Sequence, residues 1–375
     1  MKPNRFDRET KRAWLRLART PRIGPVTFHQ LHARYGSPAK ALRALPGLSR
    51  TKLPIVPFSE AAAEAELTAL EAYGGALLCL DEPDYPPHLA ALSHPPPILS
   101  SVGHTRLGHG KTVAIVGSRQ ASAAGRHVAR TLAAELSEAG WVCVSGLARG
   151  IDGEAHAASL DGGTIAVVAG GLDHIYPPQH ANLYTAIAKQ GLILSENPLG
   201  YVGQARDFPR RNRLITGLAQ GVVVIEAAER SGSLISARTA GEQGREVMAV
   251  PGSPLDPRAA GSNRLIREGA TLVRNAADVI EALSRISGTN FDAPPPPSFV
   301  PDKTDRPLSD QQIEQLFDVL SFTPMSLDEL SRAAELSVSR CAAILVELEL
   351  AGRAQTLAGG LALRVPDSDQ SDPLD

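Results

Sequence analysis

The stretch 206–213, RDFPRRNR, concentrates positive charge and an aromatic ring in a chain whose formal net charge is only −2. The segment contains four arginines, and its candidate contacts are Arg206, Phe208, Arg211, Asn212 and Arg213. Arginine offers phosphate oxygens a planar fork of donors, a phenyl face stacks on a base, and an asparagine amide both donates and accepts hydrogen bonds. The stretch therefore predicts contact with a nucleic-acid strand. A solvated helix start rich in arginine is the alternative interpretation.

Five loops with glycine or hydroxyl residues could belong to the same site, because each follows a short apolar run. They are 117–119 (GSR), 145–150 (SGLARG), 169–172 (AGGL), 195–198 (SENP) and 231–233 (SGS). Several lead into helix N-termini, where free backbone N–H groups and the helix dipole favour an anion. The candidate contacts on the first two loops are Gly117, Ser118, Arg119, Gly146 and Arg149. The alternative is that glycine only permits tight turns, which leaves the two arginines unexplained.

The elements that must position these loops alternate short runs rich in valine and isoleucine with longer helical segments. We predict strands at 113–116, 142–145, 164–168, 192–194, 222–225 and 247–250, with a short edge strand at 271–273. The segment 123–139 has the apolar spacing of a helix and ends before a glycine. This alternation is typical of an α/β fold, a parallel sheet with helices on both faces that binds ligands at the C-terminal ends of its strands. The segment 206–213 lies between two predicted strands and should reach that edge.

The N-terminal region predicts a separate small domain. Residues 12–45 predict short helices interrupted by glycine and proline, which indicates a small helical domain over residues 1–70. Residues 77–80 and 95–103 should add strands or extended chain beside the main sheet, in a domain that spans residues 71–287.

The C-terminal region predicts a third domain after a linker. The proline-rich segment 288–308 is typical of a semi-rigid linker. Beyond it we predict helices at 310–320, 327–336 and 339–351 and a hairpin at 353–357 and 361–365. Three helices followed by a hairpin indicate a winged-helix-like domain over residues 309–366, with a disordered tail at 367–375.

Composition excludes several classes of protein. With 43% hydrophobic and 21% charged residues, 375 residues suffice for two or three soluble domains. Residues 1–20 lack the apolar core of a signal peptide, and no apolar run reaches the roughly 20 residues that span a bilayer. Cys79, Cys143 and Cys341 form no C-x-x-C pair, which favours a cytoplasmic protein and argues against a structural zinc site.

Charge is distributed unevenly along the chain. Residues 1–50 hold 12 basic and two acidic residues, whereas residues 301–375 hold 6 basic and 14 acidic residues. The basic start attracts a polyanion and the acidic end repels one. Net charge therefore does not identify a nucleic-acid-binding protein here, and the placement of individual arginines must do so.

Three motifs typical of enzymes or cofactor sites are absent or incomplete. Gly110-Lys111-Thr112 resembles the end of a P-loop, but it precedes a strand and lacks the first glycine of that motif. The first strand of the parallel sheet leads into GSRQAS rather than G-x-G-x-x-G, so no dinucleotide cofactor is expected. There is also no G-x-S-x-G nucleophile elbow, which removes the main reason to expect a hydrolase.

Three titratable residues have both a catalytic and a structural interpretation. Asp152 and His156 lie four residues apart on a predicted helix and could form a metal or acid–base pair, although local structure is the commoner explanation. Glu226 ends an apolar strand and could act as a base or orient nearby arginines.

Seven segments together resemble the DNA-processing protein A (DprA/Smf) family. They are VAIVGSRQAS (113–122), SGLARGIDGEAH (145–156), GGLDHIYP (170–177), FPRRNRLI (208–215), SGSLISA (231–237), AVPG (249–252) and GSNRLIREGA (261–270). These segments occur in order over about 160 residues, which makes the resemblance specific. The flanks also resemble the family's SAM-like or helix-hairpin-helix-like N-terminal domain and its winged helix.

The resemblance implies an extended Rossmann-like domain that binds single-stranded DNA without catalysing a reaction, using no cofactor and no metal. Such proteins protect incoming DNA in natural transformation, form homodimers through the central domain and load the RecA recombinase. The implied phosphate pocket uses Ser118, Arg119, Gly146, Arg149, Arg211, Asn212 and Arg213. Phe208 would contact a base, and Arg206 stands where many members have a lysine.

Two further expectations concern the C-terminal domain and an alternative function. The acidic C-terminal part is a poor electrostatic match for duplex DNA, so we predict a protein-contact or regulatory role for it. The alternative function is a nucleotide-processing enzyme of the phosphoribohydrolase type, with Glu226 as its catalytic group. That group typically carries a P-G-G-x-G-T-x-x-E run, where this chain has SGSLISA.

Overall fold

The computed structural model describes residues 5–48, 55–288, 308–357 and 361–365. The chain divides into two compact units: the first is Met1–Phe6 with Ala65–Asp292, and the second is Asp7–Glu64 with Ala293–Asp375. The predicted linker, apart from its two end residues, and the predicted tail lie outside the described residues. The domain boundaries inferred from the sequence stay predictions.

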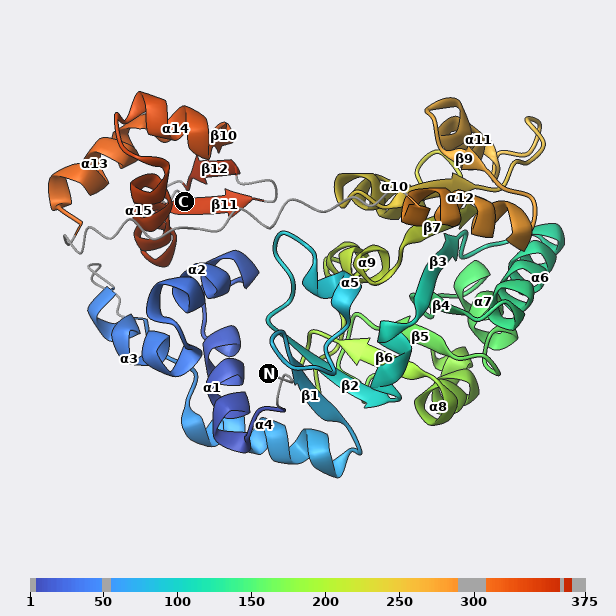
Figure 1. The fold of residues 1–375 in the computed structure, drawn as a ribbon, viewed down its shortest axis with the longest axis horizontal. Coiled ribbons are helices and arrows are strands. Elements are labelled where there is room, and N and C mark those ends of the chain that lie inside the picture. The colour runs from blue at the N-terminus through green and yellow to red at the C-terminus, as the bar shows by residue number, and fades with distance from the viewer. Residues whose placement is uncertain (1–4, 49–54, 289–307, 358–360, 366–375) are drawn as a thin grey trace, which may run out of the picture. The chain divides into compact units, whose positions relative to one another are not determined.

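The first unit is built on a nine-stranded sheet with the order β1-β2-β6-β5-β4-β3-β7-β8-β9 (Figure 1). The strands are β1 (Ala76–Cys79), β2 (Ile98–Gly103), β3 (Lys111–Gly117), β4 (Trp141–Ser145), β5 (Thr164–Val167), β6 (Leu192–Ser195), β7 (Gly221–Ile225), β8 (Glu246–Ala249) and β9 (Thr271–Leu272). All neighbours from β6 to β9 pair in parallel, whereas β2 pairs antiparallel with β1 and β6. The predicted parallel sheet is confirmed, and so are the added strands at its edge.

Helices cover both faces of this sheet. They are α5 (Pro87–Ala90), α6 (Ala123–Glu138), α7 (Ile151–Ala158), α8 (Ala181–Gln190), α9 (Asp207–Leu218), α10 (Gly232–Glu242), α11 (Ala260–Arg267) and α12 (Ala276–Gly288), with short 3-10 turns η1 (Thr105–His109) and η2 (Pro178–His180). Leu132 of α6 and Val279 of α12 belong to the apolar core on one face, while Leu214 of α9 and Ala237 of α10 belong to the core on the other. Burial on both faces explains why the central strands are continuous runs of valine and isoleucine.

The strand order reverses at β3, which pairs with β4 on one side and β7 on the other. Gly117 at the end of β3 lies opposite Ile225 at the end of β7. The chain leaves β3 towards α6 and leaves β7 towards α10, so the two connecting loops diverge and leave a crevice. Ligands of open parallel sheets bind at such a reversal.

The second unit contains a helical part and a winged helix. The helices of the first part are α1 (Arg8–Arg19), α2 (Pro25–Tyr35), α3 (Pro38–Leu48) and α4 (Glu60–Ala72), of which α4 crosses the division between the units. The winged helix comprises α13 (Asp310–Val319), α14 (Leu327–Ala333), α15 (Val338–Leu350) and a sheet of β10 (Met325–Ser326), β12 (Leu361–Arg364) and β11 (Ala354–Leu357). Thr27 Oγ1 of α2 donates to Glu349 Oε2 of α15 at 2.9 Å. The predicted helical and winged-helix parts are therefore both present.

His156 of α7 is wholly buried in the first unit. Its Nδ1 lies 2.8 Å from Thr164 Oγ1, and that hydroxyl donates its own proton to the carbonyl of Cys143 at 2.9 Å. Thr164 Oγ1 therefore accepts a hydrogen bond from Nδ1–H, which places a hydrogen on Nδ1. Burial lowers the pKa of His156 to about 3.

This burial predicts an acid-sensitive fold. Because the pKa of His156 is lower in the folded chain than in the unfolded chain, its contribution is complete above about pH 6.5 and is lost as the pH falls towards 3. Between pH 7 and 5 the loss should be about 2 kcal/mol of unfolding free energy. Urea titrations of the wild-type chain and of His156→Gln should show a shallower pH dependence in the variant. The same pH dependence in both would contradict this assignment.

Candidate nucleic-acid interface

An open cleft of about 810 Å³ lies at the C-terminal ends of the central strands. Seven of the residues predicted from the sequence line it: Gly117, Ser118, Arg119, Gly146, Phe208, Arg211 and Asn212. They come from the loops after β3 and β4 and from the first turns of α9, so the topology does bring these distant segments together.

Two close backbone approaches fix the loop that carries Arg119. A Cβ on Gly117 would lie 1.9 Å from the carbonyl oxygen of Ile225, so only glycine fits where β3 ends beside β7. Gly150 adopts a φ of +76°, and a Cβ there would lie 2.2 Å from the carbonyl oxygen of Ser118. The backbone N–H of Ile151 donates to that same oxygen at 3.2 Å. Arg119 is therefore presented by a backbone that is fixed on both sides.

An aromatic pair with two nearby guanidiniums lies in the cleft. The rings of Phe208 and Tyr176 meet edge to face, with centroids 5.6 Å apart and planes inclined by 67°. The Cζ atoms of Arg119 and Arg211 lie 5.2 and 5.9 Å from the centroid of Phe208. Tyr176 is 48% exposed, and Arg119 is exposed as well. A base can stack here while its phosphates meet positive charge.

Arg211 differs from the other predicted arginines because it is buried, with only 6% of its surface exposed. Its Nη1 donates to the carbonyl oxygens of Gly146 and Val167, the first at 2.6 Å. Burial lowers the pKa of Arg211 to about 10, while the nearby Asp152 opposes that shift, so the side chain stays charged at neutral pH. Arg211 thus joins α9 to the ends of β4 and β5, a positioning role that the sequence did not indicate.

Gly146 also has a role that differs from the predicted one. Its N–H donates to Asp152 Oδ2 at 3.1 Å, and its carbonyl accepts from Arg211, so the protein itself uses both polar groups. A Cβ at this position would lie 2.8 Å from the guanidinium of Arg211. Gly146 therefore makes room for Arg211 and does not offer its amide to a phosphate.

Three predicted contacts lie outside the cleft lining. Arg213 forms an ion pair with Glu196 and is half-buried. Arg206 is exposed at the start of α9. Arg149 is exposed at a neighbouring hollow, where its Nη2 lies 3.4 Å from Gln179 Oε1. Spacing along the chain could not separate these arginines from Arg119, because their directions depend on the tertiary fold.

Four further residues of the cleft are not among the contacts predicted from the sequence. Tyr176 and Arg230 line the cleft, as do Ser231 and Ser233 at the start of α10. Ser231 caps that helix by accepting from the N–H of Ser233 at 3.4 Å. The sequence marks the SGS loop as a candidate anion site, and Arg230 directly before it is the signal from which these further contacts could be predicted.

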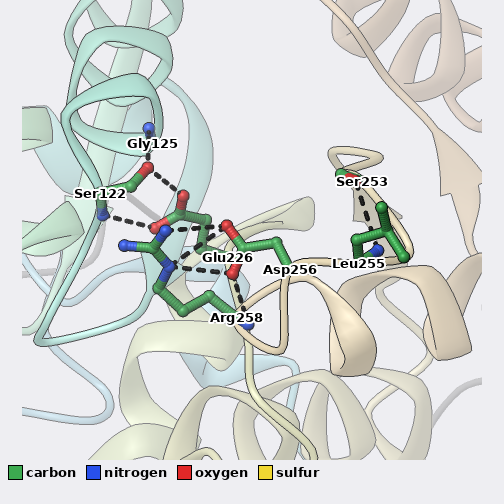
Figure 2. A network of polar contacts seen from close by, with 7 residues as sticks. All are labelled: Ser122, Gly125, Glu226, Ser253, Leu255, Asp256 and Arg258. Atoms are coloured by element: carbon green, nitrogen blue, oxygen red, sulfur yellow. Dashed lines mark hydrogen bonds and ion pairs between the residues drawn. The ribbon is translucent and has the colours of Figure 1, made fainter.

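Glu226 is engaged by the start of α6 (Figure 2). Its carboxylate accepts from the N–H of Ser122 at 2.8 Å and from the hydroxyl of Ser122. Arg258 lies beside this carboxylate, and its hydrogen bonds to Asp256, followed by the attraction of Glu226, raise the pKa of Arg258. Glu226 therefore holds the N-cap of a helix, which supports the structural interpretation.

Asp152 and His156 do not act together. Asp152 accepts from the backbone of Gly146 and Ala148, whereas His156 contacts Thr164. Burial raises the pKa of Asp152, although the charge of Arg211 opposes this effect. Within the described ranges, no group of three or more His, Cys, Asp or Glu side chains could hold a metal ion.

Three family models match successive parts of the chain. The model described as DNA recombination-mediator protein A matches residues 76–284. A DprA-like N-terminal HHH domain matches residues 8–69, and a DprA winged helix domain matches residues 293–360.

Individual relatives give the same result. DNA processing protein DprA of Bacillus subtilis is 45% identical over 220 residues, which is 58% of this chain and 74% of that protein. Protein Smf of Escherichia coli is 39% identical over 306 residues, 81% of each chain.

Two solved structures are also similar. The X-ray structure of DNA processing protein A from Streptococcus pneumoniae has a TM-score of 0.56 and 39% identity, and the match covers 60% of this chain and 77% of that one. DNA processing protein A from Helicobacter pylori, whose structure is described by its single-stranded DNA binding mode, has a TM-score of 0.52 and 32% identity, covering 56% and 96%. Because the central family model alone matches more than half of the sequence, this chain belongs to the DNA recombination-mediator protein A (DprA/Smf) family.

Proposed function

We propose that this protein binds single-stranded DNA without sequence preference through the cleft at the ends of β3 and β7. One observation carries the proposal: an aromatic pair, Phe208 and Tyr176, lies beside the exposed guanidinium of Arg119. Every base has a face that can stack on a ring, and every nucleotide has a phosphate for an arginine. Such a site therefore favours a strand whatever its sequence.

The family membership supports a role in recombination. We propose that the chain protects incoming DNA during natural transformation and loads the RecA recombinase onto it. We further propose that it acts in the cytoplasm, as a homodimer formed through the first unit. In the ranges that the structure describes, no helix has the length and apolar character needed to cross a membrane.

The enzymatic alternative is not favoured. It relies on Glu226 as a catalytic base, but that carboxylate is hydrogen-bonded to Ser122 at the start of α6. The family to which the chain belongs is described as a recombination mediator.

The winged helix is proposed to contact protein rather than duplex DNA. Its Arg353 and Arg364 stack on Phe317, with Cζ atoms 3.6 and 4.0 Å from the ring centroid. Arg332 Nε donates to the carbonyl of Asp328 at 3.2 Å. These cations are held by neighbours within the domain, and the C-terminal part of the chain has a large excess of acidic residues.

Replacing Arg119 with Ala should weaken oligo-dT binding about tenfold, because one charge-assisted contact contributes about 1.5 kcal/mol. The log–log salt slope should become less steep by about 0.7, the value for one phosphate contact on a single strand. Fluorescence anisotropy at several salt concentrations measures both. Arg285→Ala, which removes an exposed arginine paired with Glu281 on α12, is the matched control and should bind like the wild-type chain. Wild-type affinity and slope in Arg119→Ala would contradict the proposed cleft.

Replacing Phe208 with Ala should weaken oligo-dT binding by about 1–3 kcal/mol, through lost stacking. The salt slope should stay unchanged because no phosphate contact is removed. Phe208→Trp should restore affinity, and its indole fluorescence should be quenched by the bound strand. Loss of affinity in both variants would show that the ring only supports the fold.

Removing the winged helix should leave duplex binding unchanged. A chain ending at residue 292 and the full chain should bind duplex DNA within about twofold of each other, because residues 301–375 hold 14 acidic and only 6 basic residues. Electrophoretic mobility shifts at moderate salt measure this. A tenfold loss on truncation would mean that the winged helix reads duplex DNA.

A further inference from the structure

A second hollow of about 420 Å³ lies beside the main cleft and shares Arg119 with it. The hollow is formed by the first turns of α6 and α7 and by the turn before α8. Arg126 and Arg149 line it with Arg119, and His180 completes one side. This places Arg149, which lies outside the main cleft, in a positively charged site of its own.

Among the described residues, many arginines of the first unit form ion pairs, and the three arginines of this hollow form none. Pairs on other surfaces are Arg238–Glu242, Arg258–Asp256, Arg264–Glu268, Arg274–Asp278 and Arg285–Glu281. In the described part of the chain, no carboxylate forms an ion pair with Arg119, Arg126 or Arg149. Like charges gathered without counter-charges repel one another, and a bound anion relieves that repulsion.

The hydrogen bonds that Arg126 and Arg149 do form are long, and therefore weak. Arg126 Nε donates to the carbonyl of Ala121 at 3.3 Å, and Arg149 Nη2 lies 3.4 Å from the side chain of Gln179. The one carboxylate in the lining, Glu154, is paired with Arg130 at 3.2 Å. The charge facing the hollow is therefore strongly positive.

The chemistry of the lining distinguishes this hollow from the main cleft. Its described lining residues include no Phe, Tyr or Trp, and its one imidazole, His180, is half-buried with Nδ1 3.0 Å from the carbonyl oxygen of Leu147. The hollow therefore lacks the exposed aromatic pair that the main cleft offers to a base. Arginine forks bind phosphate oxygens, and open hollows on the rim of a site suit a backbone that passes through. The ligand that fits is the phosphodiester backbone, with its bases turned towards solvent.

We propose that a bound strand continues from the main cleft across Arg119 into this second hollow, where Arg126 and Arg149 hold its phosphates. This inference rests on the proposed function of the main cleft. A short strand fills the cleft alone, and a longer strand occupies both sites, so the contribution of the second hollow depends on strand length.

The test compares oligo-dT of about 4 and about 16 nucleotides, which spans the usual range of site sizes. Arg126→Ala and Arg149→Ala should each weaken binding of the long strand about tenfold and reduce its salt slope by about 0.7, while leaving the short strand unchanged.

Glu154→Gln should strengthen binding of the long strand several-fold, because it removes the only carboxylate among the described lining residues and releases Arg130. A gain of affinity cannot arise from misfolding.

Three outcomes would overturn the inference. Wild-type binding of both lengths by Arg126→Ala and Arg149→Ala would show that the strand does not reach the hollow. Equal losses for both lengths would make the hollow part of a single cleft. Loss of inorganic phosphate binding in calorimetry, with both oligonucleotides unaffected, would identify a site for free phosphate. Failure of the main cleft itself is recognised separately, since Arg119→Ala and Phe208→Ala would then bind both lengths like the wild-type chain.

Discussion

A guanidinium with almost no access to water organises the cleft. Arg211 reaches from α9 to the carbonyl oxygens of Gly146 and Val167, at the ends of two neighbouring parallel strands. A buried cation is tolerated only when polar groups replace its water, and two carbonyls with the nearby Asp152 do so here. This contact fixes the first turns of α9, and thereby places Phe208 beside Arg119 on the opposite loop.

The arrangement depends equally on the absence of side chains. Gly117 lies against the carbonyl of Ile225, Gly146 against Arg211 and Gly150 against the carbonyl of Ser118. Any Cβ at these positions would push apart the loops that form the rim. Glycine in these loops therefore serves close packing, and the anion-binding character comes from the arginines that the packing presents.

The arginines of the first unit divide into three groups by environment. Arg211 and Arg245 are held by backbone carbonyls, and many exposed arginines on the outer helices are neutralised by a carboxylate. Those around the cleft and the second hollow, such as Arg119 and Arg149, have no such partner in the described residues. A chain with a net charge near zero can thus carry a concentrated positive site. Carboxylates neutralise many of the arginines on other surfaces, so the unpaired arginines at the cleft attract an anion most strongly.

The sequence by itself determined the parallel sheet, the helices around it, the winged helix and the loops that meet at the reversal of strand order. These follow from local periodicity and turn residues, which act over a few positions. It also predicted that the segments of Phe208 and Arg119 meet at one edge of the sheet, and both residues line the cleft there. Only the tertiary structure decided the environment of each arginine. Arg211 is buried, Arg213 is paired with Glu196 and Arg149 faces a separate hollow. The direction and partner of a long side chain depend on residues far away in the chain, such as Gly146 and Val167 for Arg211, and no local pattern records them.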